Sequence, residues 1–285
     1  MGILTGTVAI VTGASRGAGR GVARGLGEAG ATVYVTGRSV RGGNTTNGRR
    51  ETIEDAAEAV NAAGGTGIPV RCDHTNDADV AALFDRVQRE QGRLDLLVNA
   101  AWGGNDIDDG GRKPFWERPA ELWDLMFTSG VRAALIASRF AIPLMLQRNE
   151  GLIVNMSYLF PGGKYYGHFY YDLAKAALNR MVVGMAGDLT RQGTGIAAVA
   201  VSPGWMRTEI VLDTVGAGEE NWREFPELAR TESPLYLGRA VAALAADPNI
   251  IEKTGRTLVV GELAREYGFV DVDGRQVPPF IPDED

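Results

Sequence analysis

Short apolar runs rich in β-branched residues alternate along the chain with longer stretches of helical periodicity. The runs are hydrophobic at nearly every position, which is typical of strands buried on both faces. They cover residues 7–12, 31–36, 67–71, 94–99, 151–157, 195–202 and 256–260. The helical stretches cover residues 18–29, 52–63, 77–91, 119–147, 172–192 and 235–246. This alternation predicts a doubly wound α/β fold of Rossmann type, a parallel sheet of about seven strands with helices on both faces.

No linker-like segment divides the pattern, so we expect a single domain over residues 1–285. The polar segments 38–50 and 205–233 are expected to form loops or lids on that domain. No apolar stretch reaches the roughly 18 residues that a membrane helix needs. The first residues also lack the basic region and long apolar core of a signal peptide. We therefore expect a soluble, cytoplasmic protein.

Glycine is unusually abundant, at 38 of the 285 residues, about twice the usual share. The glycines follow no three-residue period, which excludes a collagen-like chain. The net charge of −7 and the absence of a long basic run argue against nucleic acid or an anionic membrane as a partner. Cys72 is the only cysteine, so no intramolecular disulfide can form. Two histidines, His74 and His168, leave little for a histidine-based metal site, and we expect no metal.

Seven glycines fall between residues 13 and 30, between the first strand and the second. Glycines at the start of a helix that follows a buried strand let the backbone approach a pyrophosphate, which then sits at the helix N-terminus. We expect this turn to bind a dinucleotide through Gly13, Ser15, Arg16, Gly17, Ala18 and Gly19. The later glycines of the group, Gly21, Gly25, Gly27 and Gly30, are expected to allow close helix–sheet packing or to end the helix.

The turn reads T-G-x-x-x-G-x-G from Thr12 to Gly19, and in this it resembles the short-chain dehydrogenase/reductase family. The resemblance extends from about Gly6 to Val260. It implies that Asp73 contacts adenine and that Pro203, Gly204 and Thr208 hold the nicotinamide carboxamide. The stretch from Asn99 to Ala101 matches the family's Asn-Ala-Gly, with alanine in place of the glycine, and the resemblance implies that Asn99 binds the cofactor. The segment 205–233 then becomes the expected substrate loop, and residues 262–285 a C-terminal extension.

The choice of cofactor follows from charge at the end of the second strand. A carboxylate there hydrogen-bonds a ribose 2′-hydroxyl and repels a 2′-phosphate. This chain has Gly37 followed by Arg38, and Arg16 lies in the phosphate-binding turn. Guanidinium groups bind a dianionic phosphate in bidentate fashion. The sequence therefore predicts NADP(H) rather than NAD(H).

Tyr171 and Lys175 are four residues apart, which places both on one face of a helix. A nearby cation favours the phenolate and lowers the pKa of a tyrosine toward the range useful for acid–base catalysis. The resemblance implies that Tyr171 is the catalytic acid/base. It also implies that Lys175 tunes Tyr171 and binds the nicotinamide ribose.

A third catalytic hydroxyl is expected to orient the substrate. Ser157 lies 14 residues before Tyr171, where relatives usually have about 13, and Tyr158 is the alternative. We favour Ser157. Gly130 stands where many relatives have a fourth-helix asparagine whose carbonyl supports a water relay to the lysine.

The resemblance implies an oxidoreductase that interconverts a carbonyl compound and an alcohol, assembled as a homodimer or homotetramer. Two segments, Lys113–Pro119 and Glu262–Arg275, point to one branch of the family that also tends to lack the asparagine. Aromatic residues near the expected pocket suit an apolar or aromatic substrate. They are Trp102, Phe160, Tyr165, Tyr166, Phe169 and Trp205. The alternative is a non-catalytic NADP(H)-binding regulator of the same fold.

Overall fold

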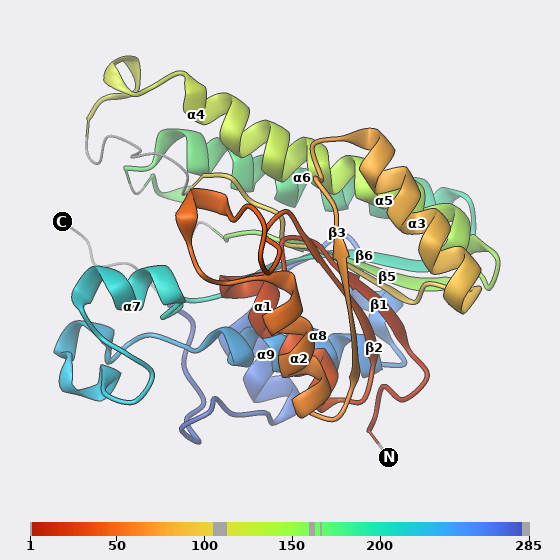
Figure 1. Ribbon diagram of the computed structural model, residues 1–285. Helices are drawn as coiled ribbons and strands as arrows, with labels where there is room; N and C mark the ends of the chain where they lie inside the picture. The colour runs from red at the N-terminus through yellow and green to blue at the C-terminus, as the bar shows by residue number, and fades with distance from the viewer. Residues whose placement is uncertain (1, 105–112, 160–162, 166, 281–285) are drawn as a thin grey trace.

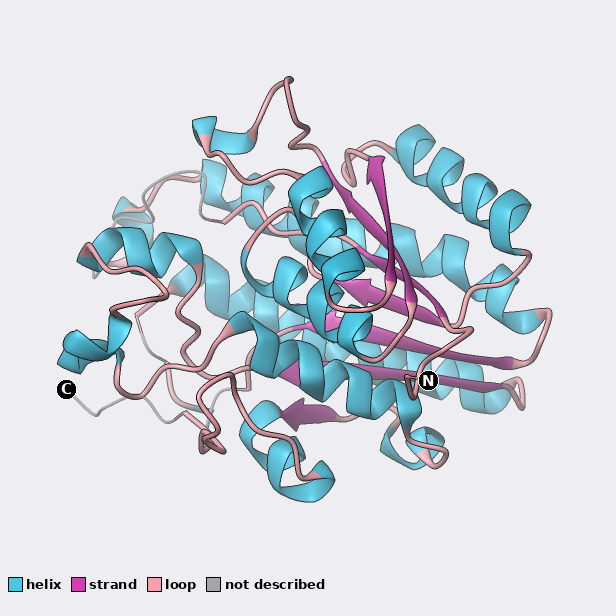
Figure 2. Cartoon of the chain, turned by 60° about the horizontal axis from the view of Figure 1, so that its bottom comes forward, coloured by secondary structure: helices cyan, strands magenta, loops and turns pink. Residues whose placement is uncertain are grey.

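The strands form one parallel sheet in the order β3-β2-β1-β4-β5-β6-β7, as Figures 1 and 2 show. The computed structural model describes residues 2–104, 113–159, 163–165 and 167–280. The strands are β1 (Val8–Val11), β2 (Thr32–Gly37), β3 (Thr66–Arg71), β4 (Leu96–Asn99), β5 (Glu150–Met156), β6 (Gly195–Ser202) and β7 (Thr257–Val259). The doubly wound α/β fold and the seven strands are as the sequence predicts.

Helices cover both faces of this sheet (Figure 1). One layer contains α1 (Gly17–Glu28), α2 (Ile53–Ala62), α8 (Pro234–Ala246) and α9 (Val260–Tyr267). The other contains α3 (Asp77–Gln91), α5 (Ala133–Leu146) and α6 (Phe169–Arg191). Along β1, Ala9 and Val11 face the first layer and Val8 and Ile10 face the second. This alternation explains why the strand is hydrophobic at every position.

The helix expected at 119–147 is a continuous helical run, Glu121–Leu146, in three parts. A short α4 (Glu121–Trp123) passes into a π-helical segment, Asp124–Arg132, and then into α5. By length and composition this run could cross a membrane, although the sequence analysis found no apolar stretch of that length. The run packs against α3 and α6, which accounts for its apolar residues within the fold.

The segment 205–233 is more structured than the loop that the sequence predicts. It contains α7 (Glu209–Val215), which begins at the side-chain cap of Thr208, and two 3₁₀ turns. Leu212, Trp222 and Leu228 form a small core of its own. The buried Asp271 of the C-terminal extension pairs with the buried Arg207 at 3.3 Å. The extension therefore holds this segment onto the domain.

Helix α1 packs against α8 through glycines. A Cβ added at Gly21 would lie 2.1 Å from the carbonyl oxygen of Pro234, and one at Gly25 would lie 2.4 Å from the carbonyl carbon of Gly238. The close packing expected of these glycines is present, but here the partner is a helix rather than the sheet. Gly27 likewise faces the backbone of Val60 in α2.

We predict that Gly21→Ala destabilises the protein by about 1–3 kcal/mol, because the added methyl group collides with backbone that cannot rotate away. The matched control is Gly184→Ala in α6, where an added Cβ meets nothing within 4 Å. That change should stabilise the helix by up to about 1 kcal/mol. Urea unfolding of both variants measures the difference. Equal free energies of unfolding for the two variants would contradict the conclusion that the packing of α1 on α8 requires glycine at position 21.

Candidate active site

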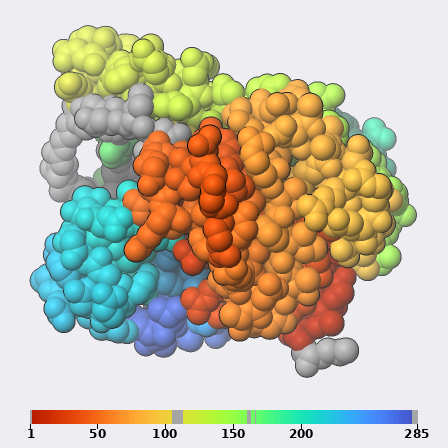
Figure 3. Space-filling model, viewed as in Figure 1, coloured from red at the N-terminus to blue at the C-terminus, as the bar shows by residue number. Residues whose placement is uncertain are grey.

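A cavity of about 290 Å³ lies at the carboxyl ends of the strands, where the chain order of the sheet reverses between β1 and β4. Ligands of open α/β sheets bind at such a switch point. The segment after β2 lies beside α7, where Arg49 pairs with Asp213 at 2.8 Å. Figure 3 shows these two segments, in orange and cyan, next to each other on this face of the molecule.

The glycine-rich turn forms one wall of the cavity, and all six residues expected there line it. Gly13 has a φ of +64°, and a Cβ on it would lie 2.6 Å from Cα of Ala101. Gly17 has a φ of +54°, and a Cβ on Gly19 would lie 2.4 Å from the carbonyl oxygen of Gly13. Only glycine fits these conditions. The turn leaves backbone N–H groups at the start of α1, which fits a dinucleotide phosphate.

A carboxylate already contacts this turn. Glu209, the first residue of α7, accepts a hydrogen bond from the Gly17 N–H at 2.8 Å and lies 3.6 Å from Arg20. Glu209 is not among the residues that the sequence predicts at the cofactor, because its contact with Gly17 joins two segments far apart in the chain. It places negative charge at the turn where a pyrophosphate would bind.

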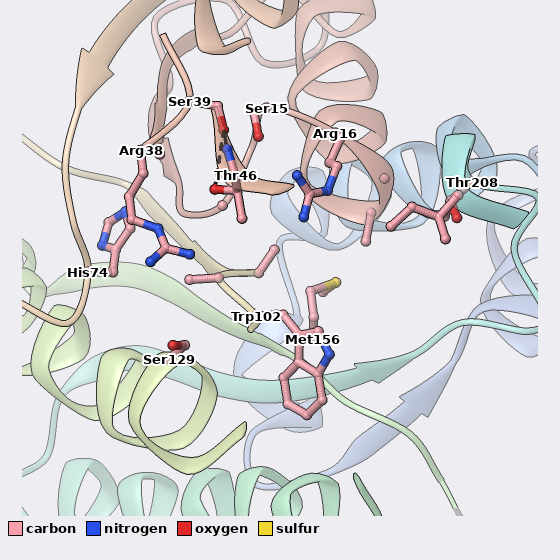
Figure 4. A pocket seen from close by; sticks show the side chains of 18 of the residues that line it. Ser15, Arg16, Arg38, Ser39, Thr46, His74, Trp102, Ser129, Met156 and Thr208 are labelled. Atoms are coloured by element: carbon pink, nitrogen blue, oxygen red, sulfur yellow. Dashed lines mark hydrogen bonds between the residues drawn. The ribbon is translucent and has the colours of Figure 1, made fainter. Parts of the chain in front are cut away.

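Arg38, Ser39, Asp73 and His74 surround the other end of the cavity. In Figure 4 the Arg38 side chain extends beside His74, while Arg16 and Thr208 lie across the cavity. Asp73 accepts hydrogen bonds from the N–H and the hydroxyl of Thr75. Complete burial lowers the pKa of His74 to about 4, so its ring is neutral at pH 7. The positive charge at this end of the cavity therefore comes from Arg38 and not from His74.

Tyr171 and Lys175 both line the cavity from the first turns of α6. The Lys175 ammonium donates to the Met156 carbonyl at 3.1 Å and lies 5.4 Å from the centroid of the Tyr171 ring. Burial lowers the pKa of Lys175 to about 8. Burial, with Tyr158 and Asp172 nearby, raises the pKa of Tyr171. The sequence predicts that the nearby lysine lowers the pKa of Tyr171. In the structure the pKa is raised instead, because the effect of burial is larger.

Both candidates for the third hydroxyl lie near Tyr171. Ser157 is the first residue after β5 and lines the cavity, and its hydroxyl donates to the Lys175 carbonyl at 2.9 Å. The ring of Tyr158 lies 6.3 Å from that of Tyr171. The Tyr158 carbonyl is held by the amide of Asn179 at 2.8 Å.

Two residues expected to bind the cofactor do not line the cavity. The Asn99 amide donates to Asn155 and Ser138, so the side chain joins β4 to β5 and α5. Gly204 faces the buried carboxyl group of Glu232, which would be 2.8 Å from an added Cβ. In contrast, Pro203 and Thr208 line the cavity as expected.

Several lining residues had no sequence signal, because they come from unrelated strand ends and loops. They include Ser39, Thr46, Thr75, Ser129, Met156, Met206 and Ile210. Of the expected aromatic residues Trp102 lines the cavity, whereas Tyr165, Phe169 and Trp205 do not, and Phe160 and Tyr166 lie outside the described residues. Among the residues that the structure describes, no three His, Cys, Asp or Glu side chains gather as metal ligands.

Comparison with known proteins defines the class to which this fold and site belong. Residues 7–215 match the short chain dehydrogenase family, and the chain belongs to the short-chain dehydrogenase/reductase family, whose members are oxidoreductases that bind nicotinamide cofactors. Its sequence is 39% identical over 287 residues to Dehydrogenase/reductase SDR family member 1 of Mus musculus and 38% over 288 residues to that of Homo sapiens. Both alignments cover 98% of this chain and 87% of the relative. This is the branch to which the two sequence segments pointed.

Solved structures agree with this placement. A putative dehydrogenase from Xanthomonas campestris superposes with a TM-score of 0.78 at 25% identity, covering 100% of each chain. A 7 alpha-hydroxysteroid dehydrogenase complexed with NADH and a 7-oxo bile acid superposes with a TM-score of 0.69 at 26% identity, covering 90% of this chain and 93% of the other. Sequence similarity and structural similarity therefore both place the chain in this family.

We predict that Glu209→Gln tightens binding of the nicotinamide dinucleotide about three- to tenfold. The substitution keeps the side-chain shape and an acceptor for the Gly17 N–H, but it removes a negative charge that repels the pyrophosphate. Fluorescence titration with NADPH and NADH measures the change, with the exposed Glu227→Gln as control. Weaker binding by the Glu209 variant would instead show that its charge orders the turn for the ligand.

Proposed function

We propose that this protein is an NADP(H)-dependent oxidoreductase that interconverts a carbonyl compound and an alcohol. The observation that carries the proposal is convergence on one cavity: Tyr171 and Lys175 from α6 line the same space as the glycine-rich turn after β1. The glycine-rich turn and the start of α6 are about 150 residues apart in the sequence, and they meet at the switch point of the sheet. Membership of the oxidoreductase family supports the reaction class.

A nicotinamide dinucleotide, held by the glycine-rich turn, Pro203, Thr208 and Lys175, would supply or accept the hydride. The chain's own residues handle the proton. Tyr171 holds it on the phenol and donates it to the alkoxide oxygen in reduction, and it takes it back in oxidation. Burial raises the pKa of Tyr171, so a cation close to the phenolate is needed for this exchange near neutral pH. Lys175 is that cation, and Ser157, or alternatively Tyr158, orients the substrate oxygen.

The preference for NADP(H) rests on charge at the adenosine end. β2 ends at Gly37, so no carboxylate stands there to bind a 2′-hydroxyl, and Arg16 and Arg38 both line the cavity. Arg38 lies beside His74 at that end, with Arg16 across the cavity from it, and guanidinium groups favour a 2′-phosphate. Solved structures of similar fold include one with NADH and one with NADPH, so the choice of cofactor rests on the residues of this chain.

The substrate is proposed to be apolar or aromatic, because Trp102, Met156 and Met206 line the cavity. A homodimer or homotetramer is proposed because α5 and α6 expose large apolar side chains, which include Leu135, Leu146, Leu173 and Val183. A cytoplasmic location stays a prediction from the sequence. The alternative function is a non-catalytic NADP(H)-binding regulator, and the retention of both Tyr171 and Lys175 favours the enzyme.

We predict that Tyr171→Phe abolishes turnover while NADPH binding persists, since only the proton-carrying oxygen is removed. Turnover is followed by NADPH absorbance with a panel of carbonyl compounds, and binding by NADPH fluorescence. Unchanged turnover in this variant would contradict the assignment. If the wild-type protein binds NADPH but oxidises it with no carbonyl compound, the regulator is favoured.

We predict that the wild-type protein prefers NADPH to NADH and that Arg38→Ala raises KM for NADPH about ten- to hundredfold. One charge-assisted contact to the 2′-phosphate is worth roughly this much, whereas KM for NADH should barely change. Steady-state kinetics with both cofactors measure the effect. Arg50→Ala is the matched control, because that side chain is 91% exposed. A wild-type preference for NADH would overturn the proposal.

A further inference from the structure

Trp102 lies three residues after the end of β4, and its indole packs closely against Gly104 and Gly130. A Cβ added at Gly104 would lie 2.6 Å from the indole nitrogen, and one added at Gly130 would lie 2.8 Å from its benzene ring. Real Cβ atoms essentially never come so close. Glycine on both sides of the ring is therefore a condition for this position of the indole. Gly130 lies in the π-helical segment Asp124–Arg132, a kind of distortion that is frequent at functional sites.

The indole contacts both members of the catalytic pair. The Lys175 ammonium lies 4.2 Å from the centroid of the Trp102 ring, within the range of a cation–π contact. The Tyr171 ring meets the indole edge to face, with centroids 5.7 Å apart. Figure 4 shows Trp102 beside Met156, whose carbonyl accepts a hydrogen bond from the same ammonium.

Lys175 has no carboxylate partner among the residues that the structure describes, although its side chain is buried. A buried ammonium is destabilised unless other groups replace its hydration. The Met156 carbonyl replaces part of it, and two aromatic faces also attract the cation, that of Trp102 at 4.2 Å and, further away, that of Tyr171 at 5.4 Å. Such a contact is strongest where the cation is desolvated, as it is here.

We propose that Trp102 is a positioning residue for catalysis, which holds the Lys175 ammonium in place and keeps it charged next to Tyr171. This inference rests on the proposed function, because it concerns the proton carried by Tyr171. The indole acts through Lys175 and takes no proton itself. Gly104 and Gly130 serve the same purpose by leaving room for the ring.

The direction of the effect follows from the groups around Lys175. Burial lowers its pKa to about 8, and the described titratable groups nearby are Tyr171 and Asp172 on α6 and Tyr158 after β5. Removing the indole face lowers the pKa of Lys175 further, so the ammonium is lost at a lower pH. The Tyr171 phenolate then loses its stabilising cation and forms at a higher pH.

The test compares Trp102→Leu, which removes the aromatic face, with Trp102→Phe, which keeps a smaller one. Trp123→Leu is the matched control, because Trp123 is half-exposed on the preceding helical run and stacks on Phe127. The first measurement is the pH profile of kcat/KM for alcohol oxidation, which needs the phenolate. The second is the titration of the Lys175 ammonium in the protein without cofactor, read from the pH dependence of labelled lysine NMR signals and assigned by the signal that Lys175→Met lacks.

In Trp102→Leu we expect the acidic limb of the oxidation profile to move up and the Lys175 midpoint to move down, each by about 0.5–1 pH unit. kcat should fall at neutral pH by about three- to tenfold, with NADPH affinity changed less. Trp102→Phe should recover most of the shift, and Trp123→Leu should show none. Gly130→Ala should reproduce the shift, because its methyl group displaces the indole without removing it.

An unmoved limb and midpoint in a folded Trp102→Leu protein would overturn the proposal and leave the indole a packing role only. Thermal melting of each variant shows whether it is folded, and if Trp102→Leu is not, the Trp102→Phe and Gly130→Ala proteins decide. If the wild-type protein turns over no substrate, the proposed function fails, but the Lys175 midpoint still tests the contact between Trp102 and Lys175.

Discussion

Hydrogen bonds connect the end of β1 to the end of β4, and the whole site depends on this contact. The Thr12 hydroxyl accepts hydrogen bonds from the N–H groups of both Ala100 and Ala101, each at 3.0 Å. The next residue, Gly13, leaves no space for a side chain against Ala101. The glycine-rich turn therefore starts at a fixed place on the sheet. Trp102, the next residue after Ala101, is placed by the same contact, so the phosphate end and the catalytic end of the cavity share one anchor.

Charge within the cavity is unevenly distributed although the protein as a whole is acidic. Arg16, Arg38 and Lys175 line it as cations, whereas Asp73 and Glu209 line it as carboxylates, Glu209 against the glycine-rich turn. An anionic dinucleotide would meet attraction at the two arginines and repulsion at the two carboxylates. Affinity is thus set by a balance of opposed charges, and long-range attraction from the acidic surface adds nothing to it.

The sequence was sufficient to predict the strands, most helices and the glycine-rich turn between β1 and α1, since these depend on local periodicity and on glycines with positive φ. It could not predict the roles of Asn99 and Glu209. Asn99 belongs to a family motif, yet its amide is used to join β4, β5 and α5. Glu209 acts across 192 residues, on the Gly17 N–H. Such contacts depend on how α7 folds back over the turn, which periodicity does not encode.

Gly130 shows how a departure from a family pattern changes meaning once its neighbours are known. From the sequence it was the loss of an asparagine near the lysine. In the structure a side chain at this position would collide with the Trp102 indole, and the indole covers the Lys175 ammonium. The glycine and the tryptophan therefore form one arrangement, because the indole can take this position only beside a residue without a side chain. A catalytic lysine buried without a carboxylate partner needs some neighbour to replace its hydration, and an aromatic face can do so without adding a competing charge beside Tyr171.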